Sequence, residues 1–444
     1  MIDESGSPRL LKVASAIGAV GAVILLARLT VFMADPTKVG YSTLPSSQWE
    51  VEHSCLSAYH IAANAAGTMN VYESSLYTAS TDTGIGLRQA KRLGPFKVDV
   101  FEYPPQFLLL PRALHVVTPD FMDLRLLWFG FSVAMLLTAS VVVARYMGGA
   151  VGTRVLLLSP LLWISPTTTL STLQKGNVQI VIIAAALMAM VLIMRGHRAF
   201  GGAMLAFATV SKLWPGILIV YLLARRDWRA VGWVAAFGAA FSAITFAMFG
   251  WSAYAAFLDH APRLMSGEAF PAFRSPAAMV INLSIPNILF KLNIFGVPGA
   301  TFEVAKVLGS IYTIIMIVIT VWAARRPWRP VDQPLVWLGI LILATLRSPF
   351  LPMTYGAIPA IWLLTLVGAG RVPTGRWLTL VGVAWIGLNL AWPIDWSVDP
   401  RIGAGVSFVP LILTVAIAAR VLRREAVATA FDASTTRANS LSVS

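Results

Sequence analysis

The chain has 444 residues, of which 57% are hydrophobic and only 12% are charged, with 15 tryptophans and 26 prolines. A soluble domain has no use for so much apolar sequence, so the composition predicts an all-α protein that crosses a membrane many times. The net charge of +14 does not indicate nucleic-acid binding, because the arginines fall in short loops between apolar segments, where the positive-inside rule accounts for them.

The chain begins with an apolar segment over residues 11–32, which we interpret as an uncleaved first helix rather than a signal peptide. Arg9, just before it, and Lys12, at its start, place the N-terminus in the cytoplasm. Residues 33–123 then form an outer loop far longer than an ordinary connection, and residues 250–302 form a second one. The remaining apolar segments alternate with basic turns, which predicts about ten crossings with both ends of the chain inside.

The domain organisation that follows is simple. We predict one integral-membrane domain over residues 1–424, followed by a disordered cytoplasmic tail over residues 425–444. The tail is rich in alanine, serine and threonine and lacks the apolar residues needed for a packed structure. Residue Cys55 is the only cysteine, which excludes an internal disulfide and a cysteine-cluster metal site.

The segment from Phe200 to Ala224 is apolar but has basic residues at both ends, which a single crossing does not explain. We predict a re-entrant hairpin of two short helices, broken at Pro215, whose arms of about twelve residues reach roughly 18 Å into a core of ~30 Å. Lys212 then lies at the tip. A cation at that depth is costly, so a lipid phosphate is its expected partner. The alternative is that Lys212 snorkels or pairs with a carboxylate such as Asp259.

Carboxylates in the first outer loop are candidates for a catalytic base. Glu50, Glu52, His53 and Glu102 are expected just above the bilayer, where a carboxylate can deprotonate a sugar hydroxyl. A short helix over residues 57–66 and a second interfacial stretch over 107–117 hold them there. The alternative for any one of these groups is an ordinary solvated loop charge. Within this loop we predict substrate contacts from His53, Tyr59, His60 and Tyr103.

The later outer loops supply further polar candidates. Lys175 precedes a helix start, where free N–H groups favour anions. Arg347 and Lys212 are predicted to approach one anionic head group, because a guanidinium binds two phosphate oxygens at once. Taken singly, each of these residues also has a structural interpretation, such as helix capping by asparagine. The predicted substrate-binding residues in these loops are Asn177, Gln179, Asp259, His260, Asn282 and Tyr355.

Several short motifs occur in an order that resembles glycosyltransferase family 87 of the GT-C superfamily, over roughly residues 57–355. This family comprises polyprenol-phosphate-mannose-dependent α-mannosyltransferases of bacterial cell envelopes. The motifs are Tyr59-x-x-Ala62 with Gly67 and Tyr72, Phe101-x-Tyr103-Pro104-Pro105, Gly176-Asn177-x-Gln179, Ser211-Lys212-Leu213-Trp214-Pro215, Asn282-Leu283-Ser284 and Ser348-Pro349.

The resemblance implies an inverting transfer of a hexose, mannose in the family, from a polyprenyl-phosphate donor to a glycolipid or glycan acceptor. It implies a bacterial plasma-membrane protein whose active site faces the exterior, with no cofactor and with a metal ion that is often dispensable; we predict no metal-binding residues. Cationic side chains, here Lys212, Arg347 and Lys175, would stabilise the departing phosphate. Members usually carry an aspartate shortly before the tyrosine that matches Tyr59. That aspartate is missing, so Glu52 is one candidate base and Glu102 the other.

Two other functions remain open at this point. A flippase or transporter for a polyprenyl-phosphate sugar would also use a buried cation, although the chain shows no pair of interrupted helices in two halves. An inactive structural scaffold is the third possibility, since the Ser348-Pro349 motif continues to Tyr355 without the family's histidine. The expected partners are membrane lipids, the lipid-linked sugar and its acceptor, and no nucleic acid.

Overall fold

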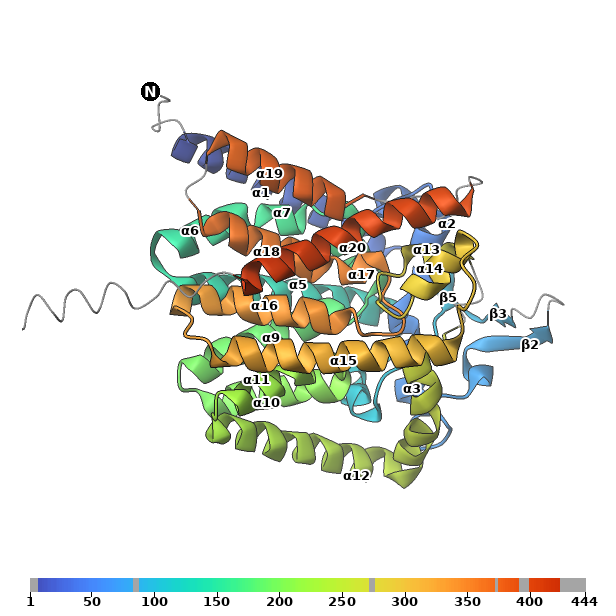
Figure 1. The fold of residues 1–444 in the computed structure, drawn as a ribbon. Coiled ribbons are helices and arrows are strands. Elements are labelled where there is room, and N and C mark those ends of the chain that lie inside the picture. The colour runs from blue at the N-terminus through green and yellow to red at the C-terminus, as the bar shows by residue number, and fades with distance from the viewer. Residues whose placement is uncertain (1–6, 83–87, 271–275, 372–373, 391–398, 424–444) are drawn as a thin grey trace, which may run out of the picture.

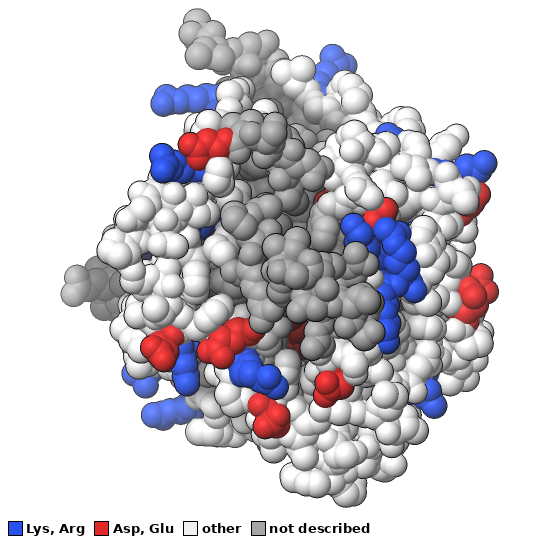
Figure 2. Space-filling model, turned by 90° about the vertical axis from the view of Figure 1, so that its right-hand side faces the viewer, with Lys and Arg blue, Asp and Glu red and all other residues white. Residues whose placement is uncertain are grey.

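The computed structural model describes residues 7–82, 88–270, 276–371, 374–390 and 399–423. The predicted tail at 425–444 lies outside these ranges. Most helices run side by side along one direction in a single bundle (Figure 1). Tight turns join them at one end, and the irregular segments, short strands and short helices gather at the other. Charged side chains are spread around this second end, seen face-on in Figure 2.

Five helices are long and apolar enough to cross a membrane, or six if a bent pair is counted as one span. The five are α1 (Ser7–Ala34), α5 (Phe121–Met147), α12 (Trp228–Ser266), α15 (Phe302–Arg325) and α20 (Pro400–Leu422). The pair bends by 62° and joins α6 (Gly149–Leu158) and α7 (Pro160–Trp163) to η4 (Pro166–Leu170) and α8 (Ser171–Lys175). Exposed apolar side chains such as Ile314 and Phe246 line the long helices, as expected for surfaces in lipid. The chain is therefore a helical membrane protein.

The shorter apolar helices explain why the sequence predicts more crossings than the long helices provide. They are α9 (Gln179–Met194), α11 (Ile217–Ala224), α16 (Gln333–Thr345), α17 (Met353–Gly356) with α18 (Ile358–Ala369), and α19 (Gly375–Leu388). Nearly all residues of α9, α16 and α18 are buried. A helix enclosed by other helices is apolar all round, and hydropathy alone does not distinguish it from a span. The count of about ten crossings therefore remains a prediction.

The first irregular segment, between α1 and α5, contains the only strands among the described residues. Its helical elements are η1 (Val39–Tyr41), α2 (Gln48–Glu52), α3 (Cys55–Ala65), η2 (Ser74–Leu76), η3 (Pro105–Leu108) and α4 (Leu109–His115). Its strands are β1 (His53–Ser54), β2 (Thr78–Asp82), β3 (Arg88–Ala90), β4 (Arg92–Leu93) and β5 (Phe96–Val98). Strand β5 pairs in parallel with β1 and antiparallel with β4, so the sheet order is β1-β5-β4. This pairing places the start of α3 beside the residues that follow β5.

The hairpin has the geometry predicted from its basic flanks. Helix α10 (Arg198–Ser211) ends at Lys212, whose backbone is extended, and η5 (Trp214–Gly216) turns the chain into α11. The two flanks meet at the tightly connected end, where the Arg198 guanidinium forms an ion pair of 3.1 Å with Asp227. Both flanks therefore lie at one end of the bundle, and Lys212 lies inside the molecule.

The second irregular segment, between α12 and α15, is anchored to the turn after α16. It contains α13 (Pro276–Ile281) and α14 (Ile288–Ile294), and η7 (Pro330–Asp332) precedes α16. Asn282 is fully buried; its side-chain oxygen accepts hydrogen bonds from the Ser284 and Leu351 amides, and its side-chain nitrogen donates to the Pro349 carbonyl. Asn282 thus holds the Ser348-Pro349 turn in place.

Candidate active site

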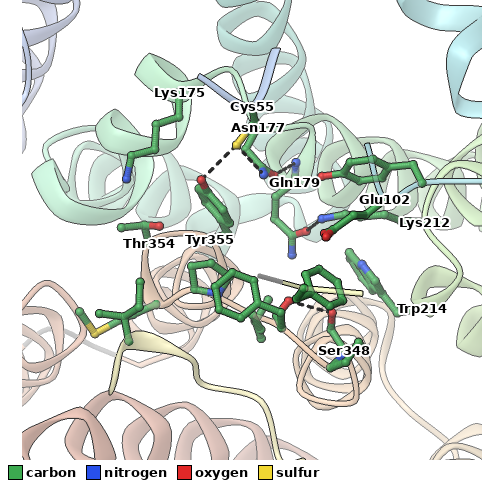
Figure 3. Close-up of a pocket in the computed structure, with 18 of the residues that line it drawn as sticks. Cys55, Glu102, Lys175, Asn177, Gln179, Lys212, Trp214, Ser348, Thr354 and Tyr355 are labelled. Atoms are coloured by element: carbon green, nitrogen blue, oxygen red, sulfur yellow. Dashed lines mark hydrogen bonds between the residues drawn. The ribbon is translucent and has the colours of Figure 1, made fainter. Parts of the chain in front are cut away.

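A cavity of about 1250 Å³ opens between the hairpin tip, the first irregular segment and the turn after α16. One part of its wall is apolar and comes from Ile217 and Val220 of α11 and from Met316 and Ile317 of α15. The other part is polar, and Figure 3 shows its side chains pointing into a common space. The cavity thus joins an apolar wall, built partly by a membrane helix, to a cluster of charged groups.

Lys212 lies at the tip of the hairpin and lines the cavity. Its ammonium group donates a hydrogen bond of 2.7 Å to the Gln179 side-chain oxygen and lies 5.4 Å from the centre of the Tyr103 ring. Gln179 and Tyr103 are neutral partners, so the positive charge is not cancelled by them. The exposed carboxylate Asp259, the alternative partner considered from the sequence, is not part of the cavity wall. An anion entering the cavity would therefore meet a fixed cation.

Glu102 lies next to Lys212 in the cavity wall (Figure 3). Burial raises the pKa of Glu102 well above its ordinary value, the nearby Asp99 carboxylate raises it further, and the Lys212 ammonium opposes the rise. A carboxylate whose pKa is raised toward the working pH is a more effective proton acceptor than an ordinary glutamate. Glu102 therefore has both the position and the environment of a general base.

The motif Gly176-Asn177-x-Gln179 builds the polar wall from a tight turn. Gly176 ends α8 with a φ of +67°, and a Cβ there would lie 3.0 Å from Leu56, so a side chain is disfavoured on both counts. Asn177 then accepts a hydrogen bond from the Gln179 amide and opens α9. This turn directs the Asn177 side chain toward Cys55 and the Gln179 side chain toward Lys212.

Lys175 is buried, and its ammonium group forms an ion pair of 2.5 Å with Glu50. The other Glu50 oxygen accepts a hydrogen bond from Ser171, and the Glu50 carbonyl accepts one from Gln174. Breaking a buried pair leaves a charge without compensation, so this pair ties α2 firmly to α8. Lys175 does line the cavity, but its charge is already balanced by Glu50.

A second polar cluster lies at the start of α3. The His53 Nε2 atom lies 3.5 Å from the Cys55 sulfur, 3.5 Å from the Tyr355 hydroxyl and 3.6 Å from the Asp99 carboxylate. Burial raises the pKa of Asp99 to about 6 and lowers the pKa of His53 to about 3. Burial also raises the pKa of the Cys55 thiol to about 12. All four side chains line the cavity.

Arg347 is the second cation that we predicted beside Lys212. Arg347 lines the same cavity as Lys212, and its Nε group donates a hydrogen bond of 2.9 Å to Thr313 of α15. Its guanidinium packs on Gly309, where a Cβ would lie only 2.9 Å from the guanidinium carbon. The small residue therefore lets the arginine side chain lie flat along α15.

Most of the residues predicted from the sequence meet in this one cavity. Those in its wall are His53, Tyr59, Glu102, Tyr103, Lys175, Asn177, Gln179, Lys212, Arg347 and Tyr355. Tyr59 is buried, donates a hydrogen bond to the Tyr103 hydroxyl and accepts one from the Val178 amide. The structure thus brings together groups from five separate stretches of the chain.

Five predicted residues lie away from the cavity wall. Glu52 forms ion pairs of 3.0 Å with Arg92 and with Lys97 on the surface side of the sheet. A hydrogen bond from Gln48, together with these two cations, lowers the pKa of Glu52, so it is a weak base. Three of the others have structural partners: His60 contacts His115, His260 stacks on Tyr72, and Asn282 holds the turn described above. The last, Asp259, is exposed.

Asp99 and Cys55 were not among the predicted site residues, and Glu50 was considered only as one of several candidate bases, although all three line the cavity. Asp99 enters it because β5 pairs with β1 in the register His53 to Lys97 and Ser54 to Val98. Two strands of two and three residues give no periodic signal in a sequence. Glu50 is recognisable in the sequence as a carboxylate of the first outer loop, but the sequence does not indicate that Lys175 is its ion-pair partner.

The fold and the cavity define a membrane protein with an enzyme-like site, in which the Glu102 carboxylate and the Lys212 ammonium face one space beside an apolar wall. The family model "Glycosyltransferase family 87" matches residues 101–349, more than half of the chain. The chain belongs to glycosyltransferase family 87 and is a glycosyltransferase. A search of curated proteins found no match to the chain.

Proposed function

We propose that this enzyme transfers a hexose from a polyprenyl phosphate to a hydroxyl group of a glycolipid or glycan. One observation carries the proposal: a single cavity joins the apolar wall of α11 and α15 to the polar wall that holds Lys212 and Glu102. An isoprenoid chain fits the apolar wall, since apolar ligand surface binds where it is removed from water. Its phosphate would then reach the cation at the hairpin tip.

The reaction would proceed by inversion at the anomeric carbon. Glu102 takes the proton of the acceptor hydroxyl as its oxygen attacks the anomeric carbon from the face opposite the phosphate. The bond from the anomeric carbon to the phosphate oxygen breaks, and polyprenyl phosphate leaves with both bonding electrons. Lys212 stabilises the charge that develops on this oxygen, and Arg347 would assist from the same cavity. The products are the glycoside, polyprenyl phosphate and a proton on Glu102.

The finer features follow from the family resemblance and from the arrangement of the bundle. We take mannose as the sugar, a bacterial plasma membrane as the location and the exterior as the side on which the cavity opens. The basic turns at the tightly connected end support this orientation, because such turns remain in the cytoplasm. We also retain a GT-C-like arrangement of about ten crossings plus the hairpin. The partners would be membrane lipids, the donor and the acceptor.

The test is a transfer assay with the purified protein in detergent. Polyprenyl phosphate carrying a radiolabelled hexose is offered with candidate glycolipid acceptors, and nucleotide sugars serve as control donors. We expect label to move to the acceptor only from the lipid-linked donor. Movement of intact donor across a vesicle bilayer without sugar transfer would contradict the proposal and indicate a flippase.

A further inference from the structure

Three side chains that commonly bind metal ions converge at one point of the cavity wall. They are His53, Cys55 and Asp99, and their ligand atoms all lie within 4.8 Å of one another. The His53 Nε2 atom lies 3.5 Å from the Cys55 sulfur and 3.6 Å from the Asp99 Oδ2 atom. The first distance is within the range of a hydrogen bond to sulfur, and the second is slightly longer than a hydrogen bond between nitrogen and oxygen. Metal–ligand bonds of ~2.0–2.3 Å at tetrahedral angles place neighbouring ligand atoms about 3.3–3.8 Å apart.

From this geometry we infer that His53, Cys55 and Asp99 form a binding site for a divalent cation of the Zn²⁺ class. A thiolate, an imidazole and a carboxylate together suit Zn²⁺, whereas Mg²⁺ and Ca²⁺ prefer oxygen ligands. Three protein ligands leave the fourth tetrahedral position open, as in catalytic zinc sites, and all three side chains line the cavity from which a further ligand would come. An oxygen of water or of an alcohol or phosphate ligand would fill it.

Two polar side chains contact the Cys55 sulfur and would support it as a metal ligand. The Asn177 side-chain nitrogen donates a hydrogen bond to the Cys55 sulfur at 3.4 Å, and the Tyr355 hydroxyl lies 3.1 Å from it on another side. Figure 3 shows both contacts. A metal-bound thiolate accepts hydrogen bonds from both groups. Such outer partners orient the ligands of metal sites.

The other two ligands are also held in place. The His53 ring stacks on Trp49, with ring centres 4.4 Å apart. One Asp99 oxygen accepts a hydrogen bond from the Val100 amide, and the other faces His53 and is the one available to a cation. The Asp99 amide donates to the Ser57 hydroxyl. The cluster is therefore pre-organised by contacts that a bound ion would not have to break.

Three lysines, Lys175, Lys97 and Lys212, lie close enough to the cluster to repel a cation. Lys175 pairs with Glu50 at 2.5 Å, Lys97 pairs with Glu52 at 3.0 Å, and Lys212 lies next to Glu102. Ionised Cys55 and Asp99 carry two negative charges that balance a divalent ion. The single cysteine excludes a cysteine cluster, as the sequence indicates, but it does not exclude this mixed set of ligands.

The first experiment measures bound zinc in the full chain, purified in detergent with a tag that contains no histidine. The protein is stripped with a chelator, equilibrated with Zn²⁺, freed of excess metal and analysed by elemental mass spectrometry. We expect about one bound ion per chain, loss of binding in Cys55→Ser and Asp99→Asn, and full binding in the control His197→Ala. His197 is exposed in the turn before α10. Asn177→Ala should weaken binding about 10–100-fold through the outer shell.

The second experiment uses Co²⁺ as a spectroscopic probe and needs only the unaltered chain. A thiolate bound to Co²⁺ absorbs in the near ultraviolet, and Cys55 is the only thiol that can give this band. We expect the band on addition of Co²⁺ and its disappearance on competition with Zn²⁺. A folded chain that gives no such band, or zinc retained equally by Cys55→Ser and Asp99→Asn, would overturn the proposal. Neither readout depends on which sugar is transferred.

Discussion

The first irregular segment has a glutamate on its surface face and another on its cavity face, and their pKa values are shifted in opposite directions. On the surface face, Glu52 is paired with Arg92 and Lys97 and has a lowered pKa. On the cavity face, Glu102 lies beside a single lysine, and burial raises its pKa well above the ordinary value. The fold thus gives two glutamates of the same segment opposite pKa shifts, which their sequence positions alone do not distinguish.

The largest expected effect comes from removing the carboxylate on the cavity face. Glu102→Gln keeps the shape of the side chain but abolishes its ability to take a proton, so we expect kcat to fall about 10²–10⁴-fold. The matched control Glu52→Gln should retain transfer near the level of the unaltered enzyme. Equal activity of Glu102→Gln and the unaltered enzyme in the lipid-donor assay would remove Glu102 from the mechanism.

The cation beside Glu102 should have the next largest effect. Lys212→Met preserves the length of the side chain and removes the charge that we assign to the departing phosphate, so kcat/KM should fall about 10²–10³-fold. Lys97→Met removes a surface lysine that is paired with Glu52 and serves as the control. If both variants transfer sugar equally well, the cation at the hairpin tip does not contact the donor phosphate.

The pH profile should report the raised pKa of Glu102. The base is active only when ionised, so kcat/KM should increase as the pH rises through this pKa and should be lost below it. A glutamate on the surface face, with its lowered pKa, would place the same limb of the profile below pH 4.5. A rate that stays flat from pH 5 upward would contradict Glu102 as the base.

A smaller effect is expected from the scaffold that holds the cavity. Asn282→Ala leaves the Ser284 and Leu351 amides without their buried acceptor, and each unsatisfied group costs about 1–3 kcal/mol of unfolding free energy. Thermal unfolding in detergent measures the loss, with Asn293→Ala on the exposed side of α14 as control. Similar melting temperatures for the two variants would show that Asn282 does not support the turn.

The features predictable from the sequence were those with a strong local signal. Basic residues on both sides of a short apolar stretch predicted the hairpin, and the Arg198–Asp227 ion pair now joins its flanks. Lys212 was predicted as a charge inside an apolar stretch and Glu102 as a carboxylate of the first outer loop; both line the cavity, and their roles stay predictions. Asp99 was missed because only the pairing of β5 with β1 brings it to the site. Enclosed helices such as α9 are apolar all round, so their hydropathy did not reveal whether they cross a membrane.

The most direct test of this account is a structure of the protein with a non-cleavable polyprenyl-phosphonate sugar. We predict that the phosphonate oxygens lie within about 2.6–3.2 Å of the Lys212 ammonium, with the isoprenoid chain against α11 and α15 and the sugar toward Glu102. A phosphonate group bound away from Lys212, or a sugar held on the Glu52 face of the segment, would contradict it.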